Sequence, residues 1–510
     1  PNLPEPPWAE LKQNLGLLPS GQALQGIHFP RSWDEQELAR RSLAFEELLL
    51  LQLAIRREQV SFQHGNIQGI ANIEQDDLVV RIMGGLGFKL TAAQQRVIAE
   101  VFRDMERERP MNRLIQGDVG AGKTVVAALA MAKAVSSGYQ AALMVPTEIL
   151  AQQHFKSLQG IYPPNLRLEI LTSATPAKQR AGILEDTASG LVDILVGTHA
   201  LIQEDVVFRQ LSLAVIDEQH RFGVSQRAVL GQKGYWPDIL VMSATPIPRT
   251  LALTIYGDLD LSTIDELPPG RMKIKTIALR STGAEKAYRF LLQQVKQGFQ
   301  GYVVCPLIEE SEKQDLTDAT ALYQRLQETV FGRYKVGLLH GRMKPAEKEQ
   351  VINGFRQGKI NVLVSTTVVE VGVDVPNATV MIIEGAERFG LSQLHQLRGR
   401  VGRGSDQAYC ILLGDPKTEM GIQRLKVMER TTDGFEIARE DLRLRGPGDI
   451  WGLKQHGLPE LKLTDLWKDS DLLEITRDAA VHCLDQLQNN PYIQALLTKK
   501  FPRSANVAAN

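Results

Sequence analysis

A glycine-rich loop between two apolar segments is the feature that most limits how this chain can fold. The loop, QGDVGAGKT, runs from Gln116 to Thr124 and fits the pattern G-x-x-x-x-G-K-[ST]. The RLI before it predicts a strand, and the TVVAALAMAKAV that overlaps its end predicts a buried helix. Such a loop turns successive backbone N–H groups toward phosphate oxygens, and the dipole of the following helix strengthens their attraction. The arrangement predicts a nucleotide-binding α/β domain.

The residues of this loop have distinct expected roles. Lys123 would neutralise charge on the β- and γ-phosphates of ATP, and the Thr124 hydroxyl would bind Mg²⁺. The predicted ATP-binding residues of the loop are Gly117, Asp118, Val119, Gly120, Ala121, Gly122, Lys123 and Thr124. A chance glycine loop is the alternative, and its strand and helix flanks disfavour it.

Composition limits the class of protein. A chain of 510 residues should form several domains, and its 43% hydrophobic and 23% charged residues are typical of globular proteins. No apolar run approaches the length of a membrane span. The three cysteines lack disulfide or metal-ligand spacing, which suits a reducing cytosol, so we expect a cytoplasmic protein. The net charge of −1 argues against binding a polyanion over the whole surface, so any contact with nucleic acid must come from local basic patches.

Short apolar strands alternate with helices in two successive runs, which predicts two tandem parallel-sheet domains. The strands expected in the first run are AALMVP, VDILVGT, LAVIDE and ILVMSAT, and those in the second are GYVVCP, YKVGLLH, NVLVSTT, TVMIIE and AYCILLG. LPPGR at 267–271 separates the runs. The first thirty residues predict a linker, a helix is expected over 35–59, and helices without strands are expected after residue 433. The predicted divisions are 1–80, 81–270, 271–430 and 431–510.

Two further segments of the first domain carry candidate ATP-site residues. LAVIDEQH ends a strand with Asp217, which could hold Mg²⁺, and Glu218, which could orient the attacking water. In FKLTAAQQR, Gln94 has the donor and acceptor needed to read an adenine edge, and Phe88 could stack on the base. Thr91 in the same segment is the expected N-cap of a helix.

Hydroxyl and arginine side chains form a second group of candidates. In MSATPIPRT, Ser243 and Thr245 could relay the state of the γ-phosphate toward a nucleic-acid groove, although a proline-set turn is an equal alternative. In the second domain, QLHQLRGRVGRG places Gln396, Arg398, Arg400 and Arg403 among glycines. Arg400 and Arg403 are spaced to act as arginine fingers. STTVVEVGVDVP adds Asp374, which could contact ribose.

The order of these motifs over roughly 85–410 resembles that of superfamily 2 helicases. The resemblance is carried by nine segments. In chain order they are FKLTAAQQR, the phosphate loop, PTEILAQQH, GTHALI, DEQH, SATPIPRT, HGRMK, STTVVEVGVDVP (the Asp374 segment) and QLHQLRGRVGRG (the arginine segment). Within the superfamily, IHFP, LAFEELLLLQL, YGDLDLSTIDELPPGR and DGFEIAREDLRLRGPGDIWGLKQHG resemble the RecG family of branched-DNA translocases. The resemblance implies two RecA-like domains, ATP and Mg²⁺ as cofactors, and double-stranded and branched DNA as partners. It also implies a monomer, with single-stranded-DNA-binding protein as a further partner.

The resemblance assigns DNA-contacting and coupling residues as well. The expected DNA contacts are Pro146, Thr147, Glu148, Gly197, Thr198, His199, Ser243, Thr245 and Thr366, and the expected couplers in a translocation hairpin are Arg443, Arg445 and Gln455. Family members carry an N-terminal wedge domain that engages the branch point, and this chain opens in what would be the linker after it. We therefore expect branch specificity to depend on a segment outside these residues.

Three other functions compete with an ATP-driven translocase of duplex DNA. One is the motor of a transcription-repair coupling factor, which shares the hairpin motif. Another is an RNA helicase, in which a segment like 433–457 is usually missing. The third is a non-catalytic nucleotide sensor, which would need neither a water-activating Glu218 nor arginine fingers.

Overall fold

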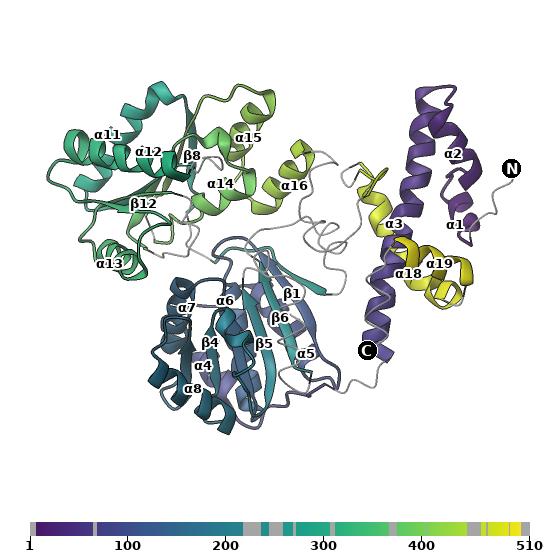
Figure 1. The fold of residues 1–510 in the computed structure, drawn as a ribbon, viewed down its shortest axis with the longest axis horizontal. Coiled ribbons are helices and arrows are strands. Elements are labelled where there is room, and N and C mark those ends of the chain that lie inside the picture. The colour runs from purple at the N-terminus through teal and green to yellow at the C-terminus, as the bar shows by residue number, and fades with distance from the viewer. Residues whose placement is uncertain are drawn as a thin grey trace. The chain divides into compact units, whose positions relative to one another are not determined.

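The computed structural model describes residues 7–64, 69–217, 236–243, 259–268, 272–306, 312–366, 375–404, 406–445, 461–465, 468–488 and 490–500. The chain divides into two compact units. One takes residues 69–246 and 262–444, and the other takes residues 1–68, 247–261 and 445–510. The first unit contains two parallel sheets, and in the second unit the described secondary structure is almost entirely helical (Figure 1).

The first sheet has seven strands in the order β3-β4-β2-β5-β6-β1-β7. The strands are β1 (Asn112–Gly117), β2 (Gln140–Met144), β3 (Leu168–Leu171), β4 (Ile194–Gly197), β5 (Leu211–Asp217), β6 (Asp238–Ser243) and β7 (Asp260–Ile264). Neighbours from β3 to β1 pair in parallel. The helices are α4 (Leu78–Gly85), α5 (Ala92–Met105), α6 (Lys123–Ser136), α7 (Glu148–Ile161) and α8 (Ala177–Ser189). Helix α6 is buried along most of its length, which explains its nearly all-apolar sequence.

The second sheet has six parallel strands in the order β10-β11-β9-β12-β13-β8. They are β8 (Lys275–Leu279), β9 (Gln300–Val304), β10 (Val336–Leu339), β11 (Val362–Ser365), β12 (Ala378–Ile383) and β13 (Tyr409–Leu413). The helices of this part are α11 (Ala284–Lys296), α12 (Glu312–Arg325), α13 (Pro345–Arg356), α14 (Leu391–Arg398), α15 (Glu419–Arg430) and α16 (Gly434–Arg445). Two apolar clusters account for the core, because both faces of a parallel sheet are covered.

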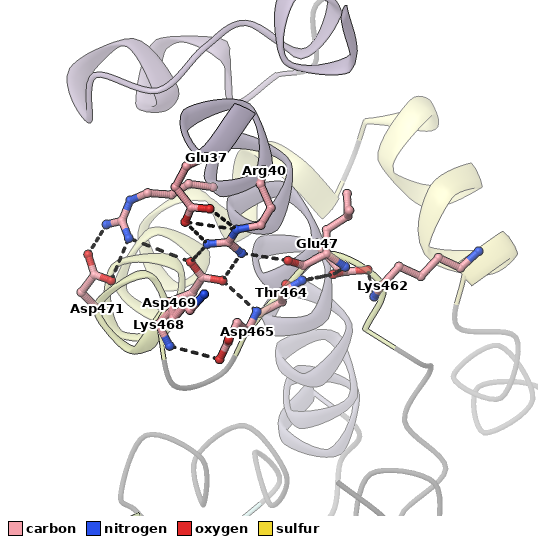
Figure 2. A network of polar contacts seen from close by, with 11 residues as sticks. Glu37, Arg40, Glu47, Lys462, Thr464, Asp465, Lys468, Asp469 and Asp471 are labelled. Carbon is pink, nitrogen blue, oxygen red and sulfur yellow. Dashed lines mark hydrogen bonds and ion pairs between the residues drawn. The ribbon is translucent and has the colours of Figure 1, made fainter. Parts of the chain in front are cut away.

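The helical unit joins segments from the two ends of the sequence. Helix α3 (Trp33–His64) packs against α2 (Ser20–His28) and against α18 (Ser470–Gln488), while α1 (Ala9–Asn14) and α19 (Pro491–Lys500) complete the described helices. Arg40 of α3 makes two hydrogen bonds of 2.8 Å to the fully buried carboxylate of Asp469 (Figure 2). The carboxylate of Glu47 accepts from the backbone N–H groups of residues 462–464 at 2.9–3.1 Å.

The sequence predicted most of this architecture. Every strand expected in the two runs is present, as are the helix over 35–59 and the helices after residue 433. One expectation is wrong: the first thirty residues are not only a linker, because α1 and α2 lie there and their buried residues, such as Ala23 and Gly26, pack in the helical unit. Strands β3, β7 and β8 were missed, because each is partly exposed and lacks a continuous apolar run.

Candidate ATP site and its neighbours

The phosphate loop lies between β1 and α6, as the sequence predicted. Gly120 and Gly122 have positive φ values of 79° and 85°, a conformation that side chains with a Cβ rarely adopt. Lys123 is 8% exposed, and its ammonium group donates to the carbonyl oxygens of Gly117 at 2.8 Å and Asp118 at 2.9 Å. Thr124 is half-buried in the first turn of α6. The loop therefore has the left-handed glycines and the helix N-terminus of a phosphate cradle.

Gln94 contacts the loop directly, but in a different way from that predicted. Its side chain closes a capping box with Thr91, the predicted N-cap of α5, and its Nε2 donates to the Ala121 carbonyl at 2.8 Å. Gln94 is 2% exposed, and a Cβ at Gly122 would come within 2.2 Å of its Nε2. Reading an adenine edge would require the side chain to give up these contacts. Phe88 is exposed, as a stacking residue would need to be.

The strand register brings the acidic and hydroxyl candidates to the same edge of the sheet as the loop. Gln116 of β1 is paired with Ser243 of β6, and Asp217 of β5 is paired with Met242 beside it. The carboxyl ends of these parallel strands therefore lie side by side, about 5 Å apart from strand to strand. This edge is where open parallel sheets bind their ligands.

Asp217 has a partner that sequence reasoning missed. His154, near the middle of α7, places Nε2 3.0 Å from the Asp217 carboxylate, and the histidine is buried. This contact orients the carboxylate that was predicted to hold Mg²⁺. The signal was present in the sequence, since His154 closes the PTEILAQQH segment, but only the fold brings α7 to the end of β5.

The arginine segment of the second sheet domain follows α14. Arg400, Arg403 and Gln396 are half-buried. Gly399 lies against the phosphate loop, because a Cβ at that position would come within 2.8 Å of the Val119 Cβ. The residue before Arg400 therefore touches the loop that would hold phosphate, as a finger arginine requires.

A chain of buried polar contacts also runs from the arginine segment to the phosphate loop. His395 places Nε2 2.5 Å from an Asp118 carboxylate oxygen, and Arg398 lies 2.8 Å from Nδ1 of the same histidine. Burial raises the pKa of Asp118, but the hydrogen bond from His395, the Val119 N–H and the charge of Lys123 together hold that pKa below its ordinary value. Asp118 is therefore ionised at neutral pH. Neither His395 nor the Asp118 carboxylate was singled out from the sequence for this contact.

The predicted DNA-contacting residues differ in accessibility. Pro146, Thr147 and Glu148 are half-buried and His199 is exposed. Thr147 caps α7, and Glu148 accepts from the Ala174 N–H at 3.0 Å. The remaining described candidates are buried: Gly197, Thr198, Ser243 and Thr366. The side chains of Thr198, Ser243 and Thr366 are packed in the protein interior, so they do not reach a DNA phosphate in this conformation.

Glu218, Thr245, Asp374 and Gln455 lie outside the described residues, and Arg445 is described only as the last residue of α16. Arg443 is exposed on α16, where its Nε donates to Glu440 at 2.7 Å. In the part of the chain that is described, no group of three or more His, Cys, Asp or Glu side chains could hold a metal ion. No described helix is long and apolar enough to cross a membrane.

Family models match three parts of the chain. They are DEAD/DEAH box helicase over residues 91–254, helicase conserved C-terminal domain over 284–405, and ATP-dependent DNA helicase RecG, domain 3, C-terminal, over 431–501. The chain is 49% identical over 482 residues to the ATP-dependent DNA helicase RecG of Bacillus subtilis (strain 168), covering 94% of this chain and 70% of that protein. It is 48% identical to the RecG of Synechocystis sp., covering 98% of this chain and 61% of that protein.

Solved structures agree with these matches. A structure of RecG bound to a three-way DNA junction aligns with a TM-score of 0.74 and 44% identity, over 93% of this chain and 62% of that one. Mss116p bound to single-stranded RNA and AMP-PNP aligns with a TM-score of 0.55 at 15% identity, over 72% of this chain and 80% of that one, which is a likeness of fold alone.

Two parallel-sheet domains, with a phosphate loop in the first and an arginine segment of the second against it, define a two-domain helicase motor of superfamily 2. The RecG domain 3 match and the identity to curated relatives then settle the family. The chain belongs to the RecG family of ATP-dependent DNA helicases.

Proposed function

We propose that this chain uses ATP hydrolysis to move along duplex DNA and thereby remodels branched DNA, such as stalled forks and four-way junctions. The observation that carries the proposal is the contact between the arginine segment and the phosphate loop, in a chain 49% identical to a RecG helicase. A motor needs such a contact, because hydrolysis in one domain must change its relation to the other.

The residues at the sheet edge have complementary roles in hydrolysis. Lys123 binds the β- and γ-phosphates, and Glu218 orients the attacking water. Arg400 and Arg403 stabilise the charge that develops on the transferred phosphoryl group. Mg²⁺ fits this site, because the Thr124 hydroxyl and the Asp217 carboxylate are oxygen ligands, of which Mg²⁺ commonly takes one or two besides water and phosphate. When bound, the ion neutralises phosphate charge.

DNA is bound mainly through its phosphates, so binding is independent of sequence and sensitive to salt. Among the described candidates, the accessible residues are Pro146, Thr147, Glu148 and His199. Arg443 on α16, together with Arg445 and Gln455, couples hydrolysis to movement. The buried free thiols of Cys305 and Cys410, whose pKa values burial raises to about 12, suit a reducing cytoplasm, and we place the activity there as a monomer.

The test is the rate of ATP hydrolysis by the full chain without nucleic acid and with single-stranded DNA, duplex DNA, a four-way junction or single-stranded RNA. We expect duplex and branched DNA to stimulate hydrolysis most. Lys123→Ala is the inactive control, because it removes the charge that binds the phosphates. Stimulation by RNA alone would indicate an RNA helicase, and ATP binding without hydrolysis would indicate a nucleotide sensor. Either result would overturn the proposal.

A further inference from the structure

Asp118 lies in the phosphate loop, yet two of its contacts come from far along the chain, one from α14 of the second sheet domain and one from the start of α16. One carboxylate oxygen accepts from the N–H of Val119 at 2.6 Å and lies 2.5 Å from Nε2 of His395. The other oxygen accepts from the N–H of Gly434 at 3.3 Å. Gly434 is the first residue of α16, the helix that carries Arg443. The side chain of Asp118 therefore joins the phosphate loop, α14 and the start of α16. We call the stretch from α16 to Gln455, which holds the expected couplers Arg443, Arg445 and Gln455, the coupling segment.

The histidine in this arrangement is fixed by its neighbour. Arg398, which is 2% exposed, donates to Nδ1 of His395, so the ring proton is on Nε2 and points to Asp118. The same guanidinium donates to the carbonyl oxygens of Met428 at 3.0 Å and Thr431 at 2.8 Å. These residues belong to the end of α15 and the connection to α16. Asp118, His395 and Arg398 are thus each held by hydrogen bonds to neighbours on two sides.

The start of α16 is built so that its first N–H is available to Asp118. Asp433 accepts from the N–H groups of Phe435 at 2.8 Å and Glu436 at 3.4 Å, which is the pattern of an N-cap residue. The N–H of Gly434 has no carbonyl partner within its own helix, as in the first turn of any α-helix. The carboxylate of Asp118 satisfies it, and negative charge is favourable at that helix end.

We propose that Asp118 is a positioning residue that ties the phosphate loop to the first turn of α16, so that a shift of the loop in the ATP cycle is passed to the coupling segment. His395 and Arg398 hold the carboxylate in place for this contact. The inference rests on the proposed function and adds to it the direct connection between the nucleotide site and the segment that couples hydrolysis to movement.

A matched pair of variants at Gly434 isolates the contact. Gly434→Pro deletes the N–H that Asp118 accepts from, while proline is well tolerated at the first position of a helix. Gly434→Ala adds the same Cβ but keeps the N–H, so it controls for crowding. Two quantities are measured for each. They are the factor by which a short duplex tightens binding of a non-hydrolysable ATP analogue, and the amount of DNA strand displaced per ATP hydrolysed.

We expect Gly434→Ala to keep both quantities within about twofold of the parent chain and Gly434→Pro to lower both by about fivefold or more, which is the size of a typical coupling between sites. We call the factor by which duplex tightens binding of the ATP analogue the coupling factor. A purely structural role of the contact would leave this factor unchanged in a variant that folds and binds both the analogue and the duplex. Equal behaviour of the two variants would overturn the proposal.

Non-additivity gives an independent check. Asp118→Asn removes the charge, and we expect it to reduce the coupling factor, but in combination with Gly434→Pro it should reduce that factor no further, because both changes act on one contact. Losses that multiply would mean that the two residues act separately, which contradicts the proposal.

A second pair of variants applies if Gly434→Pro does not fold. His395→Asn keeps an acceptor for Arg398 near the Nδ1 position but cannot reach Asp118, whereas His395→Gln extends a donor toward it. The Asn variant should lose coupling and the Gln variant should retain more of it. Greater coupling in the Asn variant than in the Gln variant would also overturn the proposal.

If the parent chain itself shows no DNA-stimulated hydrolysis, the proposed function fails. If stimulation is normal and the variants keep full coupling, only this inference fails.

Discussion

Arg400 and Arg403 follow a glycine that touches the phosphate loop, and this position predicts what their loss would do. Arg400→Ala or Arg403→Ala should still bind ATP, because Lys123 and the loop N–H groups remain. Turnover should fall by about 10³-fold or more, which is roughly 4 kcal/mol of activation free energy. Single-turnover hydrolysis and binding of a fluorescent ATP analogue measure the two effects.

Arg289→Ala provides the control for this prediction, because Arg289 is exposed on α11 of the same sheet domain. Its turnover should stay near that of the parent chain. A loss below about tenfold at both Arg400 and Arg403 would show that these two arginines are structural.

Asp238 carries a different kind of prediction, one about pH. It is buried at the start of β6, where it accepts from the Met111 N–H at 2.6 Å and from Asn72 at 2.9 Å. Burial raises its pKa well above the ordinary 3.8, and the charge of Asp104 adds to this, against the effect of the two hydrogen bonds. The folded state therefore holds the proton to higher pH than the unfolded chain does.

Because of this difference, the contribution of Asp238 to the free energy of unfolding falls as pH rises from about 4 toward neutrality. Asp238→Asn keeps an acceptor for Met111 and has no proton to lose, so its stability relative to the parent should increase over that range. Denaturation at a series of pH values checks this, with Asp260→Asn at an exposed position of β7 as the control. Parallel profiles for Asp238→Asn and the parent would contradict the assignment.

The contact between α3 and the segment before α18 joins helices more than 400 residues apart in the sequence. Arg40 pairs with Asp469, whose side chain is 0% exposed, whereas the neighbouring Arg41 pairs closely with Asp471, whose side chain is 52% exposed, and approaches Asp469 only to 4.0 Å. Removing the partner of a buried charge costs far more than removing the partner of an exposed one, which remains hydrated.

Arg40→Ala should accordingly destabilise the helical unit by about 3–5 kcal/mol, since it leaves the Asp469 carboxylate buried without its guanidinium. Arg41→Ala should cost less than about 1 kcal/mol. Hydrogen exchange of the α18 amides compares the two variants in the full chain. Similar protection in both would show that the buried pair does not hold the two segments together.

The net charge of these 510 residues bears on how the chain holds DNA. A net charge of −1 provides no general attraction for a polyanion, so binding depends on a limited set of phosphate contacts. Each contact contributes a slope of about −0.9 to log affinity against log salt. Raising salt from about 50 to 200 mM should therefore weaken duplex binding more than tenfold if two or more contacts form.

Binding of the ATP analogue supplies the comparison for this experiment, because buried contacts at the phosphate loop are screened less than exposed ones. It should weaken much less than duplex binding over the same range of salt. Duplex affinity that hardly changes with salt would mean that contacts other than those to phosphates dominate.

The sequence by itself determined the fold class, the family and the position of the phosphate loop. Each of these depends on local patterns: strands that are buried on both faces are continuously apolar, and a phosphate loop requires glycines at fixed places before a helix. The N-cap at Thr91 was predictable for the same reason, since a capping box lies within four residues.

Only the tertiary structure decided which polar side chains meet. His154 reaches Asp217 because α7, which packs against β3 and β4, passes the end of β5, and His395 reaches Asp118 across 277 residues of sequence. The burial of Gln94 and Thr366 likewise depends on what packs over them. The physical reason is that the apolar pattern of a segment shows which face of its helix or strand is buried. A hydrogen bond between two distant segments does not change the apolar pattern of either segment, so the sequence does not reveal it.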